Sequence, residues 1–188
     1  MLTVACVEWG NYQGRGAEYV EKLRSMVARH LNAPHRFECV RPNVRGLVGW
    51  WNKVELFRPG RFTGRVLYLD LDTVIVGPLE RVVECPGLIH LKRWGWAKNV
   101  YGSGCMVWDA GAHQQIYDRY TDAVPRKFEG DQNWIQSVSQ WPALPFPLVC
   151  SAKYHCKAGP PAGASVVCFH GPKKPHKSNE QWVVDNWR

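Results

Sequence analysis

Two aspartates, Asp70 and Asp72, stand directly after a short apolar run at residues 66–69. Such a run is typical of a strand buried on both faces at the centre of a parallel sheet. Open α/β sheets bind ligands at the carboxyl ends of these strands, and side chains at i and i+2 of a strand project to one side. Close carboxylates repel each other, so they are usually held by a cation or share a proton. The pair therefore indicates a divalent-metal clamp for a phosphorylated ligand or the nucleophile and acid of a phosphatase; the alternative without chemistry is that both cap a loop.

The charge of the chain points to phosphate-bearing ligands. The formal net charge is +8, which favours nucleotides, phosphorylated surface glycans or nucleic acid as partners. The chain also has ten tryptophans. Most tryptophans pack in a core, but exposed ones make platforms for sugar rings or bases.

The elements that must position the aspartates follow from periodicity. An apolar strand at residues 2–7, a Gly-rich loop, an amphipathic helix at 17–31 and a strand at 36–40 form the opening of a doubly wound sheet. We predict one α/β domain covering residues 1–188, with a mostly parallel central sheet flanked by helices. Further predicted strands are 88–91, 103–108 and 166–169. Further predicted helices are 47–57, 112–123 and 131–139, the last with Asp131 as its N-cap, whereas nothing regular is predicted after Gly171.

Seven cysteines lie scattered along the chain, and no two form a Cys-x-x-Cys pair. This odd number without a ligand spacing indicates neither a zinc ribbon nor a redox motif. The amino terminus lacks a basic leader, and no apolar run approaches the roughly 20 residues that span a bilayer. We therefore expect a cytoplasmic protein with reduced thiols and no transmembrane segment.

Six short motifs follow one another along the chain: Asn11-Tyr12, Trp51-Asn52-Lys53-Val54, Leu67-Tyr68-Leu69-Asp70-Leu71-Asp72, Tyr101-Gly102-Ser103-Gly104-Cys105-Met106-Val107, Asp131-Gln132-Asn133, and the segment 168–176 with His170, Gly171 and Lys174. Together and in this order they resemble the GT-A glycosyltransferases of family eight, the group of glycogenin and the bacterial lipopolysaccharide galactosyltransferases. The resemblance covers most of the chain. It implies transfer of a hexose from a nucleotide sugar, UDP-linked, with retention of anomeric configuration.

The resemblance also implies roles for individual residues. Asp70, Asp72 and His170 would bind Mn²⁺ or Mg²⁺, and Asp131 and Gln132 would lie at the sugar, with Asp131 on its hydroxyls and Gln132 near the anomeric carbon. The donor would be held by Asn11, Tyr12, Lys53, Asp70, Ser103, Gly104, Gly171 and Lys174. A metal on hard oxygen ligands and two lysines would neutralise the charge that develops on a diphosphate leaving group. The acceptor stays open between a glycan, a protein and, less favoured, a nucleic acid, and no oligomeric state is predicted.

Four departures separate the chain from the pattern of that family. Cys168 stands where the family has its metal-binding histidine, with His170 two residues on and on the same side of a strand. A hard cation prefers imidazole to thiolate, so we expect His170 to be the ligand; its alternative role is a structural hydrogen bond. Gly102 replaces a sugar-contacting asparagine, Asn133 a second aspartate and His176 a final tryptophan.

Several of these residues could instead have a purely structural role. Lys53 could be a solvated helix residue, Tyr12 could pack in its loop, and Asp131 could act only as a helix cap. The lysines near the end of the chain could form a solvated tail.

Two rival functions remain open from the sequence. In a haloacid-dehalogenase-type phosphatase, Asp70 would be the nucleophile and Asp72 the acid/base, with Mg²⁺; against it, a complete strand–helix–strand unit precedes the motif and the later paired acids are missing. In a non-catalytic module for nucleotides or nucleic acid, the basic aromatic segment 92–98 would bind single strands. Such a module has no use for two aspartates that repel phosphate. A glycosyltransferase acting on DNA would combine these features and bind DNA in a salt-sensitive way.

Overall fold

The computed structural model describes residues 1–41, 47–90 and 101–188. Its larger sheet has the strand order β2-β1-β3-β6-β5, which are His35–Val40, Leu2–Val7, Arg65–Leu69, Tyr101–Asp109 and Gly87–His90. β1 runs parallel to both β2 and β3, β6 is antiparallel to β3, and β5 is antiparallel to β6. Four of these five strands therefore share one direction, which confirms the predicted α/β class with a mostly parallel central sheet.

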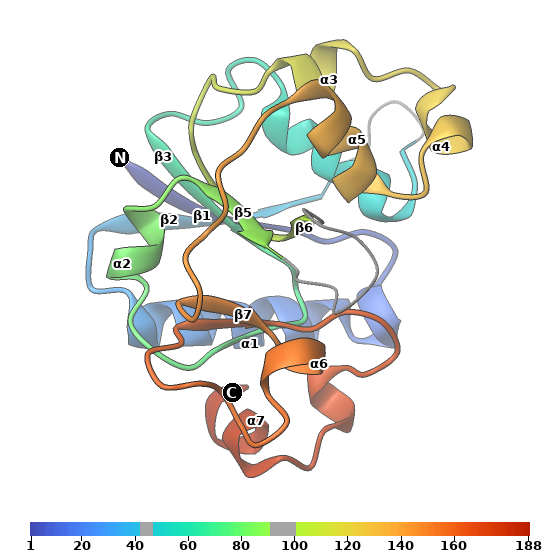
Figure 1. Cartoon of the computed structure of the whole chain (residues 1–188). Helices are drawn as coiled ribbons and strands as arrows, with labels where there is room; N and C mark the ends of the chain where they lie inside the picture. Colours follow the sequence, from blue (N-terminus) through green and yellow to red (C-terminus); the bar gives the residue numbers. More distant parts are fainter. Residues whose placement is uncertain (42–46, 91–100) are drawn as a thin grey trace.

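Alternating side chains of the central strands face two separate cores. Val4 of β1 and Leu67 of β3 belong to the core that includes helix α1 (Gly16–His30). Ala5 and Val66, one position away in each strand, belong to the core on the opposite face. Figure 1 shows α1 along one side of the sheet and helices α3 and α5 on the other. Burial on both faces is the reason that these strands read as continuous apolar runs.

The second face of the sheet is covered by short helical segments. They are η2 (Gly49–Phe57), α3 (Gln115–Asp118), α4 (Val124–Lys127) and α5 (Asp131–Val138). The α-helix predicted for 47–57 is a 3₁₀ helix, which eclipses residues three apart and here buries every residue from Trp51 to Phe57. The helix predicted for 112–123 is wrong in length, because Gly111 and His113 have left-handed backbones that delay its start until Gln115.

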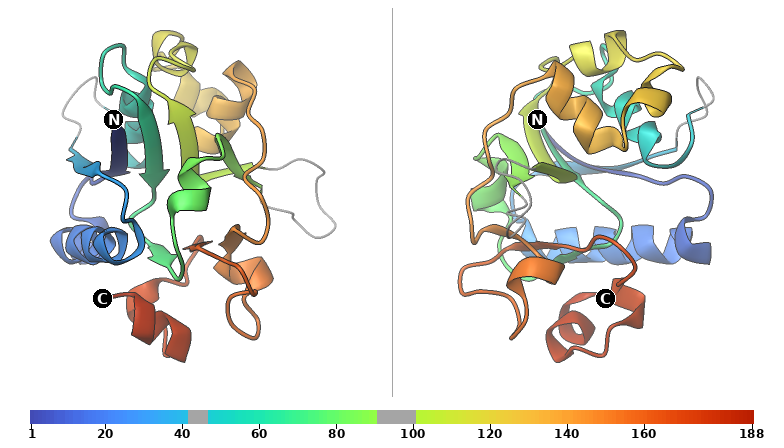
Figure 2. Two further views of the ribbon diagram at one scale, coloured as in Figure 1. Left: turned by 90° about the vertical axis from the view of Figure 1, so that its left-hand side faces the viewer. Right: turned by 45° about the vertical axis from the view of Figure 1, so that its right-hand side comes forward.

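A smaller sheet lies beside α1, just beyond the end of β3 (Figure 2). Its order is β4-β8-β7, which are Thr73–Ile75, Val166–Cys168 and Val149–Ser151. β4 is antiparallel to β8, and β7 is parallel to β8. The remaining elements are α2 (Glu80–Val83), α6 (Ala152–His155), η1 (Tyr12–Gly14), η3 (Pro175–Lys177) and α7 (Gln181–Asn186).

The segment after Gly171 was predicted to contain no regular structure. This is wrong, because it ends in the helix α7. Val183 of α7 and Trp187, the C-cap residue of this helix, are four residues apart, and both belong to the α1 core. The Trp187 ring meets Tyr19 of α1 edge-on, with ring centroids 5.1 Å apart. Two apolar residues are too few to reveal the helix as a periodic pattern.

The strand predicted at 88–91 lies at Gly87–His90, and its residue 91 falls outside the described residues. The basic aromatic segment 92–98 also lies outside them. All seven cysteines are described, and all have free thiols. No helix in the described ranges combines the length and apolarity that a membrane crossing requires.

We predict that Trp187→Ala lowers the free energy of unfolding by about 3–5 kcal/mol, because it removes a large ring that is only 9% exposed. Urea denaturation of the two proteins measures the difference. Val184→Ala on the same helix is the matched control: Val184 is 55% exposed, and its truncation should stay within about 0.5 kcal/mol of the wild type. Equal effects of the two substitutions would contradict the role of α7 in anchoring the end of the chain.

Candidate functional site

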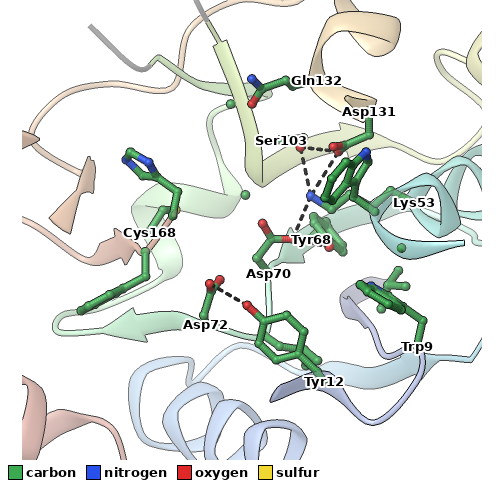
Figure 3. A pocket seen from close by; sticks show the side chains of 18 of the residues that line it. Trp9, Tyr12, Lys53, Tyr68, Asp70, Asp72, Ser103, Asp131, Gln132 and Cys168 are labelled. Carbon is green, nitrogen blue, oxygen red and sulfur yellow. Dashed lines mark hydrogen bonds and ion pairs between the residues drawn. The ribbon is translucent and has the colours of Figure 1, made fainter. Parts of the chain in front are cut away.

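A pocket of about 530 Å³ opens beyond the ends of β1 and β3. Figure 3 shows the labelled side chains converging on it from both sheets and from η2 and α5. Every residue predicted to act at the site except Asn11 lines this pocket, namely Tyr12, Lys53, Asp70, Asp72, Ser103, Gly104, Asp131, Gln132, His170, Gly171 and Lys174. Residues 162 positions apart in the sequence are thus brought to one cavity, from Tyr12 to Lys174.

Asn11 does not line the pocket. Its backbone is left-handed, with φ of 52°, and its Oδ1 accepts a hydrogen bond of 2.9 Å from the Gly16 N–H at the start of α1. This contact satisfies one of the free donors of the helix terminus. In this structure Asn11 therefore acts as a turn and helix-start residue.

Asp70 and Asp72 lie in a turn. The sequence had indicated that both project from one side at the end of the strand, but the strand itself stops before them. β3 ends at Leu69, and the Thr73 N–H donates to the Asp70 carbonyl oxygen at 3.0 Å as β4 begins. The Asp70 N–H still donates to the Gly104 carbonyl oxygen of β6 at 2.8 Å. Asp70 thus still bonds to the larger sheet, whereas Asp72 directly precedes β4 of the smaller sheet. Both carboxylates line the pocket.

Lys53 is the centre of a buried polar cluster on the larger-sheet side. Its Nζ lies 2.9 Å from Asp70 Oδ1 and 3.1 Å from Asp131 Oδ2, and it donates to Ser103 Oγ at 3.0 Å. Ser103 Oγ in turn donates to Asp131 Oδ2. Burial alone would lower the pKa of Lys53, but the charges of Asp131 and Asp70 raise it above its ordinary value. Lys53 is therefore a fixed cation and not a solvated helix residue.

Asp131 has a different structural role from the one predicted. Gly130 is the N-cap of α5, and Asp131 makes no capping hydrogen bond. Its carboxylate instead points to Lys53 and Ser103, as Figure 3 shows. Because the Lys53 ammonium is available three ångströms away, the ion pair replaces the capping contact.

Asp72 is neutralised from the smaller-sheet side. Lys174 Nζ lies 2.5 Å from Asp72 Oδ2, and the Tyr12 hydroxyl donates to the same oxygen at 2.9 Å. Burial, and then repulsion from Asp70, raises the pKa of Asp72 above its ordinary value, although Lys174 and Tyr12 oppose the rise. Burial and the neighbouring Asp72 charge raise the pKa of Tyr12, so its hydroxyl remains a donor.

The two aspartates keep oxygen atoms that a hard cation could use. Asp70 Oδ1 and Asp72 Oδ2 carry the contacts to the lysines and tyrosines, whereas Asp70 Oδ2 and Asp72 Oδ1 have no hydrogen-bond or ion-pair partner among the described residues. A Cβ at Gly104 would lie only 3.2 Å from Asp70 Oδ2, so glycine keeps that oxygen accessible. Two carboxylate oxygens beside room for a phosphate fit Mg²⁺ or Mn²⁺, which commonly takes its remaining ligands from substrate and water.

A third protein ligand is not assembled. Within the described ranges, no three His, Cys, Asp or Glu side chains are grouped so that they could hold a metal ion. β8 ends at Cys168, so His170 lies beyond the strand; its Nε2 is 2.6 Å from Ser151 Oγ. Burial and the nearby thiol and carboxylates raise the pKa of Cys168 well above its ordinary value, which keeps the thiol neutral and unsuited to a hard cation. The assignment of His170 stays a prediction.

Several lining residues were not predicted. Tyr68 lies in the apolar strand, yet its hydroxyl donates to Asp70 Oδ1 at 2.6 Å. Trp9 and Trp50 are exposed aromatic residues of the same pocket. The sequence feature that could have identified Trp50 as a pocket residue is its position three residues before Lys53, because residues at this spacing share one edge of a 3₁₀ helix.

Comparison of the sequence with models of known protein families finds no match, and comparison with curated protein sequences finds none either. Solved structures, in contrast, match over nearly the whole chain. Glycosyltransferase GlyE of Streptococcus pneumoniae TIGR4 has a TM-score of 0.65 and 15% identity over 98% of this chain. A glycosyltransferase involved in the glycosylation of the major capsid of PBCV-1 has a TM-score of 0.62 and 14% identity over 92% of this chain and 94% of its own. The galactosyltransferase LgtC, solved with donor and acceptor sugar analogs, has a TM-score of 0.51 and 12% identity over 94% of this chain and 90% of its own.

The chain therefore has a GT-A-like glycosyltransferase fold, as the motifs had indicated. It spans 58% of the length of the GlyE chain. At this level of identity these matches establish the fold, and the function must be argued from the pocket.

We predict that Lys53→Ala lowers the free energy of unfolding by about 3 kcal/mol or more, because it leaves Asp131 buried without its cation. Adding Asp131→Asn should recover part of this loss, since it removes the uncompensated charge. Urea denaturation of both single variants and the double variant gives the coupling energy. Strictly additive effects would mean that the two side chains do not depend on each other.

Proposed function

We propose that the chain is a glycosyltransferase that moves a hexose from a UDP-linked sugar to an acceptor, assisted by Mn²⁺ or Mg²⁺ and with retention of anomeric configuration. The observation that carries the proposal is the pocket. It combines two carboxylates at the end of the central strand with two lysines, Lys53 buried and Lys174 half-buried, in a fold shared with glycosyltransferases. A nucleotide sugar needs both charge types, because its diphosphate is at once the metal-binding group and the leaving group.

The smaller-sheet side is the proposed diphosphate site. Lys174 can leave Asp72 for a phosphate oxygen, and the Tyr12 ring, whose centroid is 5.5 Å from Lys174 Nζ, offers a face to the base. Gly171 has a left-handed backbone with φ of 77°, and a Cβ there would meet no atom within 4 Å. A phosphate could therefore approach the backbone at this turn.

Asp70 and Asp72 would hold the divalent cation through their partner-free oxygens, with His170 as the proposed third ligand. When bound there, the cation would neutralise charge on the departing diphosphate. Tyr68 donates to Asp70 Oδ1 and Tyr12 donates to Asp72 Oδ2, so both carboxylates are held in fixed orientations.

The larger-sheet side is the proposed hexose site. Asp131 is held by Lys53 and Ser103 and would accept hydrogen bonds from sugar hydroxyls. Gln132, the next residue of α5, also lines the pocket and would lie near the anomeric carbon. A charge-assisted network of this kind orients a sugar well because its members are already fixed before binding.

We infer that the chain acts as one domain in the cytoplasm, where its seven free thiols would stay reduced. A nucleic acid as acceptor would require salt-sensitive DNA binding.

The proposal is tested by thermal shift with UDP, GDP, ADP and UDP-hexoses, each with and without Mn²⁺. UDP species should raise Tm by about 5–10 °C at 100 times Kd, and only with the metal. The ranking among UDP-hexoses then names the donor. A response to phosphate mimics with Mg²⁺, without any response to nucleotides, would instead support the phosphatase, and no response to either would favour the binding module.

We also predict that Asp72→Asn abolishes the Mn²⁺-dependent response to UDP and lowers transfer roughly 10²-fold or more. The fold should survive, since burial already disfavours the charge of Asp72 and asparagine has the same shape. Circular dichroism and thermal shift measure the two effects. Asp185→Asn, on the exposed surface of α7, is the control and should change neither. Undiminished turnover of Asp72→Asn would remove this residue from the metal site.

A further inference from the structure

Two tryptophans form an exposed aromatic rim on the pocket. Trp50 is 52% exposed and Trp9 is 39% exposed, and both line the cavity. A Cβ at Gly49 would lie 3.8 and 3.9 Å from two ring carbons of Trp9, so the indole of Trp9 packs closely over this glycine. Large apolar side chains at such exposure, on a cavity that also holds fixed charged groups, indicate contact with a ligand.

Trp50 stands beside the proposed hexose site. It precedes Lys53 by three residues, so in the 3₁₀ helix η2 both belong to one edge, with Lys53 buried and Trp50 at the mouth. The Trp50 Nε1 atom is 3.8 Å from where a Cβ of Gly130 would lie. Gly130 is the N-cap of α5, whose first two residues are Asp131 and Gln132. An acceptor arriving at the anomeric carbon would therefore pass the face of Trp50.

The charges near the rim favour a neutral ligand. Among the described residues that line the pocket and the hollow of about 500 Å³ beside Trp9, the lysines and arginines are Lys53, Lys174 and Arg41. Each is already paired with a carboxylate, and Arg41 Nε lies 2.6 Å from Glu8 Oε2. Lys174 is the cation proposed for the donor diphosphate, and Lys53 and Arg41 stay in their ion pairs, so these three side chains leave no cation for the phosphates of a nucleic acid. A pyranose ring needs none, because its C–H face packs on an indole while its hydroxyls stay solvated.

We propose that Trp50 is a stacking platform for a pyranose ring of the acceptor, so that the acceptor is a glycan. This inference rests on the proposed function and specifies its second substrate. The same stacking chemistry could come from the donor hexose, but that ring is assigned to the buried groups Lys53, Ser103 and Asp131, all under 10% exposed. The half-exposed Trp50 is open to a ligand that arrives from solvent.

The test uses saturation-transfer NMR and titration with methyl β-D-glucopyranoside and methyl β-D-galactopyranoside as probes, on protein saturated with UDP and Mg²⁺. The ring C–H protons should receive saturation in the wild type. Trp50→Ala should weaken binding of the better glycoside about tenfold, and Trp50→Tyr should restore most of it, since an aromatic face is kept. Val184→Ala, an exposed truncation on α7, is the control and should bind as the wild type does.

The possible outcomes distinguish an acceptor role of Trp50 from a donor role and from nucleic-acid binding. Equal glycoside binding by wild type and Trp50→Ala would overturn the platform. A loss of affinity for UDP-hexose but not for UDP in Trp50→Ala would assign the ring to the donor and overturn the acceptor role. Salt-sensitive binding of a thymidine decamer that depends on Trp50, without glycoside binding, would overturn the glycan in favour of nucleic acid. Failure of the wild type to bind UDP would reject the proposed function, whereas Trp50-dependent glycoside binding in that same protein would still support the platform.

Discussion

Two carboxylates held in one tight turn set the main electrostatic constraint on this molecule. Asp70 and Asp72 repel each other, and burial of Asp72 removes the water that would screen them. Each therefore needs a cation of its own, Lys53 from η2 for Asp70 and Lys174 from the end of the chain for Asp72. The two cations come from segments far apart in the sequence, one before the turn and one near the end of the chain.

The end of the chain reaches Asp72 because aromatic contacts hold it on α1. Tyr19 meets both Tyr12 and Trp187 edge-on, and its hydroxyl lies 2.5 Å from His176 Nδ1. His176 is two residues after Lys174, so this cluster fixes the lysine relative to the turn. The His176 ring also meets Tyr19 edge-on, with ring centroids 5.7 Å apart, so this contact is both aromatic and polar.

Much of this arrangement could be predicted from the sequence, for identifiable reasons. Strands buried on both faces produce unbroken apolar runs, and ligand-binding acids stand at their ends, so β1, β3 and the pocket residues were recognisable. The hydrogen bond of Asn11 to Gly16 and the ion pair of Asp131 with Lys53, in place of a helix cap, were not, because both depend on a partner that only the folded chain supplies. The 3₁₀ form of η2 was not predicted either: an α-helix was expected for these residues.

The turn that carries the aspartates joins two sheets, and this has a consequence for how the chain folds. Lys174 and Asp72 are 102 residues apart in the sequence, and β8, which precedes Lys174, lies between β4 and β7 in the smaller sheet. Contacts so distant require closure of long loops, which lowers folding rates more than final stability. A ligand that bridges both sides of the pocket would bind only after this closure. It would therefore oppose opening of the whole chain and not of one local segment, which makes hydrogen exchange throughout both sheets sensitive to its presence.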